Sequence, residues 1–198
     1  MIRIKEFRAL LAVFLLCLSQ ALIGCASKAA SPLVWARAAE KDIPAENTFY
    51  RHSPTTVTWQ GIDGATANTC FADCSGFLNE VLKRTYGIDD TGLAAWLGSK
   101  RPVARSYHDA IEKGNGFKQI HKITDIHAGD FVAIKFLKKS SVTGHVAIAT
   151  APPRLRKPTA PILADSKQWD LAIIDSTSVP HDPYREKTSH LTLLVDSG

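Results

Sequence analysis

A cysteine at position 74 stands where a loop gives way to an amphipathic helix. Apolar residues recur behind Cys74 at helical spacing, at Phe77, Leu78, Val81 and Leu82. The N-terminus of a helix carries unpaired N–H groups and a partial positive charge, and both favour a thiolate over a thiol. A cysteine buried in the middle of a helix gains no such stabilisation. The sequence therefore predicts that Cys74 is a nucleophile.

A nucleophilic cysteine needs a base that takes its proton, and a third polar group that orients the base. Among the seven histidines, His145 opens an apolar strand directly after Gly144. Asp175 ends the next apolar segment, where an antiparallel sheet would place it beside His145 and fix the tautomer of the ring. A lone histidine at a strand start is more often a solvated edge residue, so spacing alone leaves the triad as one hypothesis. The other histidines fall on a helix, in loops or at a strand edge: His52, His108, His121, His127, His181 and His190.

The elements that must position these residues follow from the pattern of the chain. Asp73 is a typical N-cap and Gly87 a typical stop, which predicts a helix over residues 73–86. Strands are expected over residues 130–136 and 144–149. The loop between them is short enough for an antiparallel hairpin.

The remaining segments indicate the fold class. Four prolines make residues 151–168 an irregular excursion. Helices that precede antiparallel strands indicate an α+β domain rather than a parallel doubly wound sheet. The other expected elements are a short strand over 55–60, a short helix around 93–97, a helix over 106–113 capped by Ser106, and strands over 169–175 and 190–195.

Cys70, four residues before Cys74, leaves three possibilities open. A disulfide between the two would be permitted in an exported protein and would silence Cys74 as a nucleophile. A pair that opens and closes would be a redox switch, whereas a buried Cys70 would be a small hydrophobic residue. Two cysteines without further ligands at suitable spacing do not make a zinc site. No metal and no cofactor is therefore expected.

The composition is that of a protein with one globular domain, and the N-terminus is typical of export. The chain has 198 residues, of which 45% are hydrophobic and 22% charged. Arg3, Lys5 and Arg8 precede an apolar run over residues 9–18, which is typical of a secretory signal and too short for a membrane span. Removal of residues 1–24 takes away three basic residues and one acidic residue, so the net charge falls from +5 to +3. So mild a charge, together with export, argues against nucleic acid as a partner.

The end of this signal, Leu22-Ile23-Gly24-Cys25, resembles the lipobox of bacterial lipoproteins. The resemblance implies cleavage before Cys25 and a lipid anchor on its sulfur. Since Ala26 rather than Asp follows, it also implies sorting to the outer membrane, facing the periplasm. An ordinary signal peptide, in which Cys25 is incidental, is the alternative. The expected organisation is a signal peptide over 1–24, a tether over 25–46 and a catalytic domain over 47–198.

Three motifs resemble, in the expected order, those of the NlpC family of bacterial cell-wall hydrolases. They are the nucleophile motif Asp73-Cys74-Ser75-Gly76-Phe77, the strand entry Gly129-Asp130-Phe131-Val132 and the base strand Gly144-His145-Val146-Ala147-Ile148. Ile174-Asp175-Ser176 stands where the family places a third residue, more often His than Asp. The resemblance covers about residues 55–195.

This resemblance implies both a fold and an activity. The implied fold is papain-like, with N-terminal helices packed on a small antiparallel sheet. The implied activity is that of a thiol peptidase or amidase with Cys74, His145 and Asp175 as catalytic residues. Its substrate would be a stem-peptide bond of peptidoglycan or another peptide of the cell envelope.

The chain departs from the family pattern near the expected oxyanion. The family often has Tyr-x-Trp-Gly-Gly, whereas this chain has Val57-Thr58-Trp59-Gln60-Gly61, so Val57 replaces the tyrosine. The oxyanion would then rely on the backbone N–H of Cys74. The side chains expected to bind the oxyanion or the substrate are those of Trp59, Gln60, Asp73 and Ser75. The missing tyrosine also favours an alternative, an inactive domain that keeps the fold for binding or as a scaffold in the cell envelope, although the retained triad opposes it.

Overall fold

The computed structural model describes residues 31–137 and 142–178 with their side chains, and residues 189–196 as the backbone of a strand. The expected signal peptide over 1–24 and the expected lipidation site Cys25 lie outside the described residues. Within the described part of the chain, no helix is long and apolar enough to cross a bilayer.

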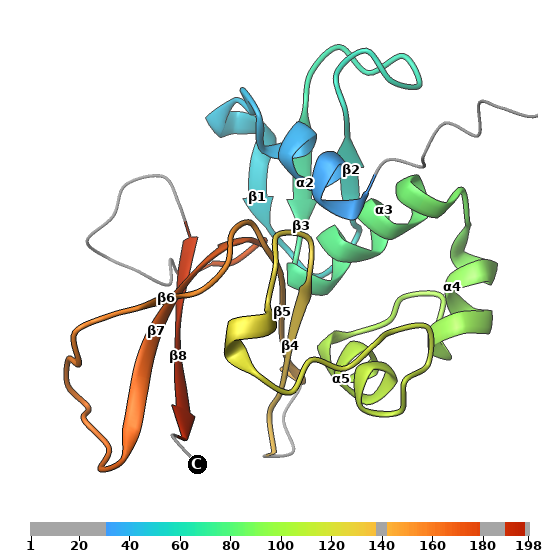
Figure 1. Ribbon diagram of the computed structural model, residues 1–198. Helices are drawn as coiled ribbons and strands as arrows, with labels where there is room; N and C mark the ends of the chain where they lie inside the picture. The colour runs from blue at the N-terminus through green and yellow to red at the C-terminus, as the bar shows by residue number, and fades with distance from the viewer. Residues whose placement is uncertain (1–30, 138–141, 179–188, 197–198) are drawn as a thin grey trace, which may run out of the picture.

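Helix α3 (Cys74–Tyr86) contacts strands of two separate sheets and lies beside both (Figure 1). Asp73 caps the helix by accepting the backbone N–H of Gly76, and Gly87 ends it in a left-handed conformation with φ of 63°. The expected helix and both of its boundaries are confirmed. Its inward face consists of Phe77, Leu78, Val81 and Leu82, each at most 5% exposed.

The larger sheet has five antiparallel strands in the order β4-β5-β7-β6, with β8 also paired to β7. The hairpin of β4 (Phe131–Lys135) and β5 (Gly144–Ala149) is confirmed. The mixed α+β class is confirmed too, with four helices and two small sheets among the described residues. The other strands of this sheet are β6 (Arg154–Leu155), β7 (Ser166–Ile174) and β8 (Ser189–Asp196).

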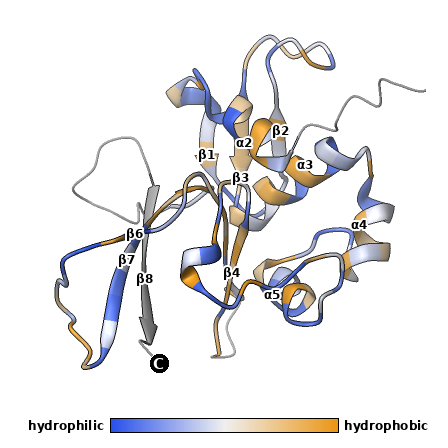
Figure 2. Ribbon diagram, in the orientation of Figure 1, coloured by the Kyte–Doolittle hydropathy of each residue, from blue (hydrophilic) through white to orange (hydrophobic). Residues whose placement is uncertain are grey.

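Strand β5 is buried on both of its faces. Val146 and Ile148 pack into the larger hydrophobic cluster together with α3, whereas Ala147 and Ala149 belong to a smaller cluster on the opposite face. Figure 2 shows hydrophobic residues on α3 and along the β4–β5 pair, and hydrophilic residues over the first half of β7. A strand covered on both sides has a continuous apolar run in its sequence, which is why the sequence located β5 so well.

A second sheet of three short strands was not expected from the sequence. Its strands are β1 (Thr48–Tyr50), β2 (Thr56–Thr58) and β3 (Thr69–Ala72), in the order β1-β3-β2. Only β2 falls within an expected strand. Strands β1 and β3 have three and four residues, which are too few to show a strand period. Strand β1 runs parallel to β3 and pairs Tyr50 with Ala72. This pairing places Tyr50 opposite a residue that lies two positions before the start of the nucleophile helix.

Helix α2 (Pro32–Glu40) occupies part of the segment that was expected to be a tether. Leu33, Ala36 and Ala39 are buried in the main core, and Arg37 donates to the backbone oxygen of Thr150 at 3.0 Å. The tether over 25–46 is therefore wrong for residues 32–40. An alanine-rich segment suits a linker in composition, but alanine is also the best helix former.

Two short helices complete the side of the molecule next to α3. Helix α4 (Asp90–Leu97) covers the short helix expected around 93–97. Helix α5 (Ala104–Glu112) begins two residues before the expected cap Ser106. The Ser106 hydroxyl accepts the N–H of Val103 at 3.4 Å, so it caps the helix from inside the first turn.

The proline-rich excursion over 151–168 is more ordered than its composition indicates. Residues 154–155 form β6, which pairs with β7. The side-chain amide of Gln168 is 3% exposed and bonds the backbone of Thr159 in both directions, at 2.8 and 2.6 Å. This buried amide holds the excursion against the sheet.

Gly144 gives a first test of the fold because it lies where two strands approach closely. Its φ is 150°, and a Cβ at this position would lie 1.8 Å from the backbone oxygen of Ile134. We expect Gly144→Ala to lower the free energy of unfolding by about 3 kcal/mol, measured by urea denaturation. Gly64→Ala is the control, since Gly64 also has positive φ but a Cβ there would meet no atom within 4 Å, and it should cost about 1 kcal/mol. Equal losses in the two variants would contradict the close approach at Gly144.

Candidate active site

The structure brings Cys74, His145 and Asp175 together. Cys74 is the first residue of α3 and is 8% exposed, and His145 is the second residue of β5. Asp175 directly follows β7, which pairs with β5. His145 Nε2 lies 2.6 Å from Asp175 Oδ2, and the Asp175 side chain is fully buried. The imidazole N–H therefore donates to a carboxylate that is shielded from water.

The charge state of His145 is set by its two neighbours. Burial lowers the pKa of His145, but hydrogen bonds with Asp175 and Cys74, and the charges of both, outweigh burial and raise the pKa from 6.5 to about 9. Since Asp175 engages Nε2, Nδ1 is the ring nitrogen that faces the Cys74 thiol. An imidazole that holds its proton at neutral pH is the partner that a thiolate requires.

Ser176 ties the end of β7 to the end of β3. Its hydroxyl donates to the backbone oxygen of Ala72 at 2.7 Å, and the thiol of Cys70 also forms a hydrogen bond with Ser176. Ala72 is the last residue of β3 and stands two residues before Cys74. This bond therefore fixes Asp175, the neighbour of Ser176, relative to the nucleophile.

Cys70 and Cys74 are both free thiols in the structure. Burial raises the pKa of Cys70 to about 11, although its hydrogen bond with Ser176 acts in the opposite direction. A thiol that stays protonated at neutral pH is a poor nucleophile and a poor redox partner. Of the three possibilities for Cys70, these properties favour the small hydrophobic residue, which is partly buried against the main core.

Asp73 uses both of its carboxylate oxygens. Oδ1 accepts the backbone N–H of Gly76 at 2.6 Å and the hydroxyl of Ser75 at 3.1 Å. Oδ2 accepts from His52 Nδ1 and from Arg101 Nη2, each at 2.8 Å. Burial raises the pKa of Asp73, but the bonds from His52, Gly76 and Arg101 outweigh burial and hold it below 3.8. Asp73 thus caps α3 beside Cys74, and Ser75 in the first turn donates its hydroxyl to this cap.

Gly76 must be small for this cap to form. A Cβ on Gly76 would lie 2.8 Å from the Thr55 hydroxyl and 3.0 Å from Asp73 Oδ1. The glycine of the nucleophile motif therefore lets the carboxylate and the β1–β2 connection approach the helix together.

Tyr50 is a site residue that the sequence did not indicate. Burial is the first cause that raises the pKa of Tyr50, followed by the negative charges of Cys74 and Asp73, while Arg101 lowers it. Its ring contacts that of His52 edge to face, with centroids 5.5 Å apart. Tyr50 therefore keeps its phenolic proton and can donate a hydrogen bond, and its strand pairs it with Ala72, two residues before Cys74.

Trp59 and Gln60 do not lie where the sequence analysis expected them. Trp59 is 8% exposed and donates its indole N–H to the backbone oxygen of Trp35 at 2.8 Å, so it is a core residue. The β2–β3 register pairs Thr58 with Thr69, at the end of β3 away from Cys74, and Gln60 lies beyond that pair. The expected oxyanion role of both residues is therefore corrected. The motif that contains them lies beside the C-terminal half of α3, where Trp59 lines a pocket with Lys83 and Arg84, and not beside Cys74 at its N-terminus.

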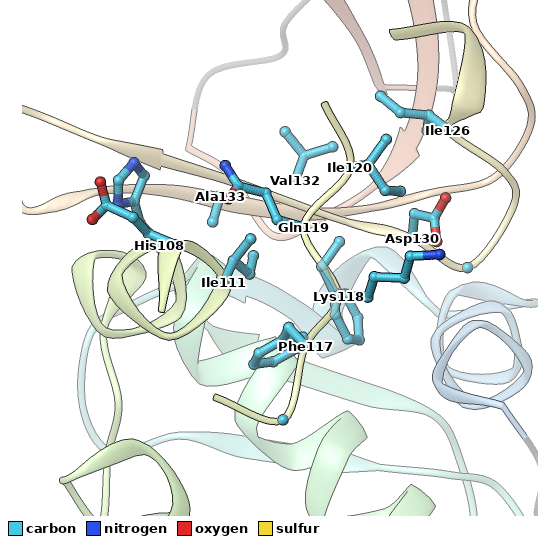
Figure 3. Close-up of a pocket in the computed structure, with 14 residues that line it drawn as sticks. His108, Ile111, Phe117, Lys118, Gln119, Ile120, Ile126, Asp130, Val132 and Ala133 are labelled. Atoms are coloured by element: carbon cyan, nitrogen blue, oxygen red, sulfur yellow. The ribbon is translucent and has the colours of Figure 1, made fainter. Parts of the chain in front are cut away.

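A separate cavity of about 490 Å³ opens between α5, residues 116–120 and β4 (Figure 3). None of Cys74, His145 and Asp175 lines it. Beside it, His108, Asp109 and Glu112 offer metal-ligating atoms within 4.8 Å of one another. Lys135 Nζ lies 2.7 Å from Asp109 Oδ1, so the carboxylate of this group already pairs with an ammonium ion.

The remaining histidines lie away from the nucleophile or outside the described side chains. His121 and His127 are exposed, and His127 Nδ1 donates to the backbone oxygen of Asp125 at 2.7 Å. His181 is outside the described residues, and His190 lies in β8, of which only the backbone is described. His145 is therefore the histidine that the described structure joins to Cys74.

Comparison with known proteins finds a viral relative. No family model matches the chain, and no solved structure matches it. The chain is 32% identical over 171 residues to "Uncharacterized protein R653" of Acanthamoeba polyphaga mimivirus, and the match covers 80% of this chain and 74% of the viral protein. The name of the viral protein assigns no activity.

The raised pKa of His145 predicts how stability depends on pH. Because the folded pKa of about 9 exceeds the ordinary value of 6.5, protonated His145 contributes its full stability below about pH 6.5, and this contribution disappears as pH rises through about 9. We expect the difference in free energy of unfolding between the wild type and His145→Gln to shrink between about pH 6 and about pH 10. Urea denaturation at several pH values measures it. A difference that stays constant or grows over this range would contradict the raised pKa.

Proposed function

The chain belongs to the family of the mimivirus protein R653, and we propose that it is a cysteine hydrolase of amide bonds that acts through Cys74, His145 and Asp175. The observation that carries the proposal is the 2.6 Å contact of His145 Nε2 with a fully buried Asp175, in a ring that also bonds Cys74 at a helix N-terminus. A nucleophile, a base and an orienting carboxylate are sufficient for amide hydrolysis.

The reaction follows from these positions. The Cys74 thiolate, paired with the His145 imidazolium, attacks the amide carbonyl carbon. The imidazolium then gives its proton to the nitrogen of the leaving amine as the C–N bond breaks, which leaves a thioester on Cys74. Neutral His145 takes a proton from water as the water attacks the thioester, the acid is released, and the thiolate–imidazolium pair re-forms.

Stabilisation of the oxyanion is assigned to two donors. One is the backbone N–H of Cys74, which belongs to the first turn of α3 and has no partner within the helix. The other is the hydroxyl of Tyr50, which the β1–β3 pairing places opposite Ala72, two residues before Cys74, and whose raised pKa keeps it a donor. The alternative of an inactive binding or scaffold domain drew on the absence of tyrosine at Val57, and Tyr50 weakens that argument.

The finer fold assignment is also a proposal. We assign a papain-like arrangement of the NlpC type, supported by a nucleophile at the start of a helix and a base at the start of an antiparallel strand that follows it in sequence. A carboxylate at the end of the next long strand completes the arrangement. The parallel β1–β3 pair is an addition to the expected helices and antiparallel sheet.

The proposed substrate is a stem-peptide bond of peptidoglycan or another peptide of the cell envelope. This assignment rests on the resemblance of the Asp73–Phe77 and Gly144–Ile148 motifs to those of the NlpC family. The proposed location, on the outer membrane facing the periplasm through a lipid on Cys25, rests on the lipobox resemblance. Mass spectrometry of the membrane fraction tests the anchor, and an unmodified soluble mature protein would contradict it.

Replacement of the nucleophile tests the activity directly. Cys74→Ala should reduce the release of products from purified muropeptides by at least about a thousandfold, because no other described side chain at the site can form the thioester. Liquid chromatography with mass detection measures the products. Cys70→Ala is the matched control and should keep most of the activity, since the Cys70 thiol serves as a small, partly buried hydrophobic group. Equal product from Cys74→Ala and the wild type would refute the nucleophile.

Removal of the Tyr50 hydroxyl tests the oxyanion assignment. Tyr50→Phe keeps the ring against His52 and should lower kcat by about a hundredfold with little change in KM, because the lost bond forms only in the transition state. Steady-state kinetics on a chromogenic amide that the wild type cleaves measures both constants. A rise in KM with kcat unchanged would assign Tyr50 to substrate binding instead.

A further inference from the structure

The carboxylate of Asp73 places a negative charge next to the proposed nucleophile. Its side chain is 6% exposed, and the bonds that it accepts keep it ionised. A buried negative charge one residue from Cys74 opposes formation of a thiolate. The helix cap, taken alone, would therefore make the cysteine less reactive.

Two groups from other parts of the chain meet this carboxylate. Arg101, from the connection between α4 and α5, places Nη2 2.8 Å from Asp73 Oδ2. The same nitrogen donates to the backbone oxygen of His52, and His52 in turn donates its ring N–H to the same carboxylate oxygen. One guanidinium thus joins the nucleophile helix to the β1–β2 connection.

We propose that Arg101 is a positioning residue of the active site. Its charge offsets that of Asp73 and so keeps Cys74 reactive. Its second bond holds His52, and with it the neighbouring Tyr50, against the start of α3. The inference rests on the proposed role of Cys74 as nucleophile and adds a residue that acts through Asp73 and His52 rather than on the substrate.

The geometry distinguishes arginine from lysine at this position. Arg101 bonds a carboxylate and a backbone carbonyl at once, and its backbone N–H is fixed by the hydroxyl of Ser99 at 3.1 Å. A lysine would carry the same charge, but its ammonium nitrogen lies one bond nearer the backbone than Nη2 and so cannot hold both acceptors in the same geometry. The two contributions of Arg101, charge and position, can therefore be separated by substitution.

The same helix offers a matched control at its other end. Arg84 Nη1 lies 2.8 Å from Asp63 Oδ2, the same distance as in the Arg101–Asp73 pair. Arg84 lies in the last turn of α3, whereas Asp73 precedes its first turn. Loss of Arg84 removes an arginine–aspartate pair of equal length far from the nucleophile.

The rate of Cys74 alkylation by iodoacetamide, followed by peptide mass spectrometry of the full chain from about pH 5 to about pH 10, tests the charge contribution. We expect Arg101→Met to slow the reaction at neutral pH by about tenfold and to move the profile to higher pH. Arg101→Lys and Arg84→Met should follow the wild-type profile. In the Arg101→Met background, Asp73→Asn should restore the rate to within about threefold of wild type, because asparagine caps a helix as well as aspartate and leaves no charge to offset.

Hydrolysis tests the positional contribution. In Arg101→Lys, kcat should stay about tenfold below wild type while alkylation is normal, since the carbonyl of His52 has lost its donor. If Arg101 were only structural, its replacement by lysine would lower stability and would not lower kcat while alkylation stays normal.

The outcomes separate the two proposals. If wild-type Cys74 is alkylated faster than a free thiol and Arg101→Met has the same pH profile, the role of Arg101 is overturned and that of the nucleophile is kept. A double variant that is as slow as Arg101→Met also overturns the role of Arg101. Wild-type Cys74 that reacts no faster than a free thiol overturns the proposed function instead.

Discussion

The hydrogen bond from the Gly76 N–H to the Asp73 carboxylate is the interaction on which the site depends. A helix must satisfy its first N–H groups, and here the residue that does so directly precedes the nucleophile. The position of Cys74 is therefore set by the geometry of a helix cap rather than by contacts of its own side chain. Whatever bonds to Asp73 acts on Cys74 as well.

Each sheet supplies a different part of the proposed site, and α3 joins them. The five-stranded sheet carries His145 on β5 and Asp175 directly after β7, its antiparallel neighbour, so the proposed base and its orienting group share one rigid support. The three-stranded sheet places Tyr50 beside the start of α3 through a parallel pair with β3. Ser176 bridges the two sheets by donating to Ala72 at 2.7 Å. The site is thus assembled at the junction, where neither sheet alone would form it.

Periodicity and capping were sufficient to locate part of this arrangement from the sequence. Cys74, His145 and Asp175 stand at the ends of elements long enough to show a helical or strand pattern, so their positions could be predicted. Tyr50 could not, because β1 has three residues and its pairing with β3 is set by tertiary contacts. Arg101 lies in a connection between helices, where no local pattern indicates which carboxylate it will meet. The motif resemblance predicted an oxyanion or substrate role for Trp59, whereas this residue lies in the core, because a core tryptophan and a site tryptophan look alike in sequence.

Two histidine–carboxylate pairs flank Cys74 with nearly equal bond lengths, 2.6 Å for His145–Asp175 and 2.8 Å for His52–Asp73. Distance alone therefore does not identify the base. The side chain of His145 is 16% exposed and its carboxylate partner fully buried, whereas the His52 side chain is 66% exposed. A low-dielectric setting strengthens the ion pair between an imidazolium and a thiolate, and water weakens it. The carboxylate partner of His52 also accepts bonds from a helix N-terminus and an arginine, so its charge is already shared among other donors. Burial of the His145 pair and the sharing of the Asp73 carboxylate among several donors, rather than bond length, favour His145 over His52 for the proposed proton transfer.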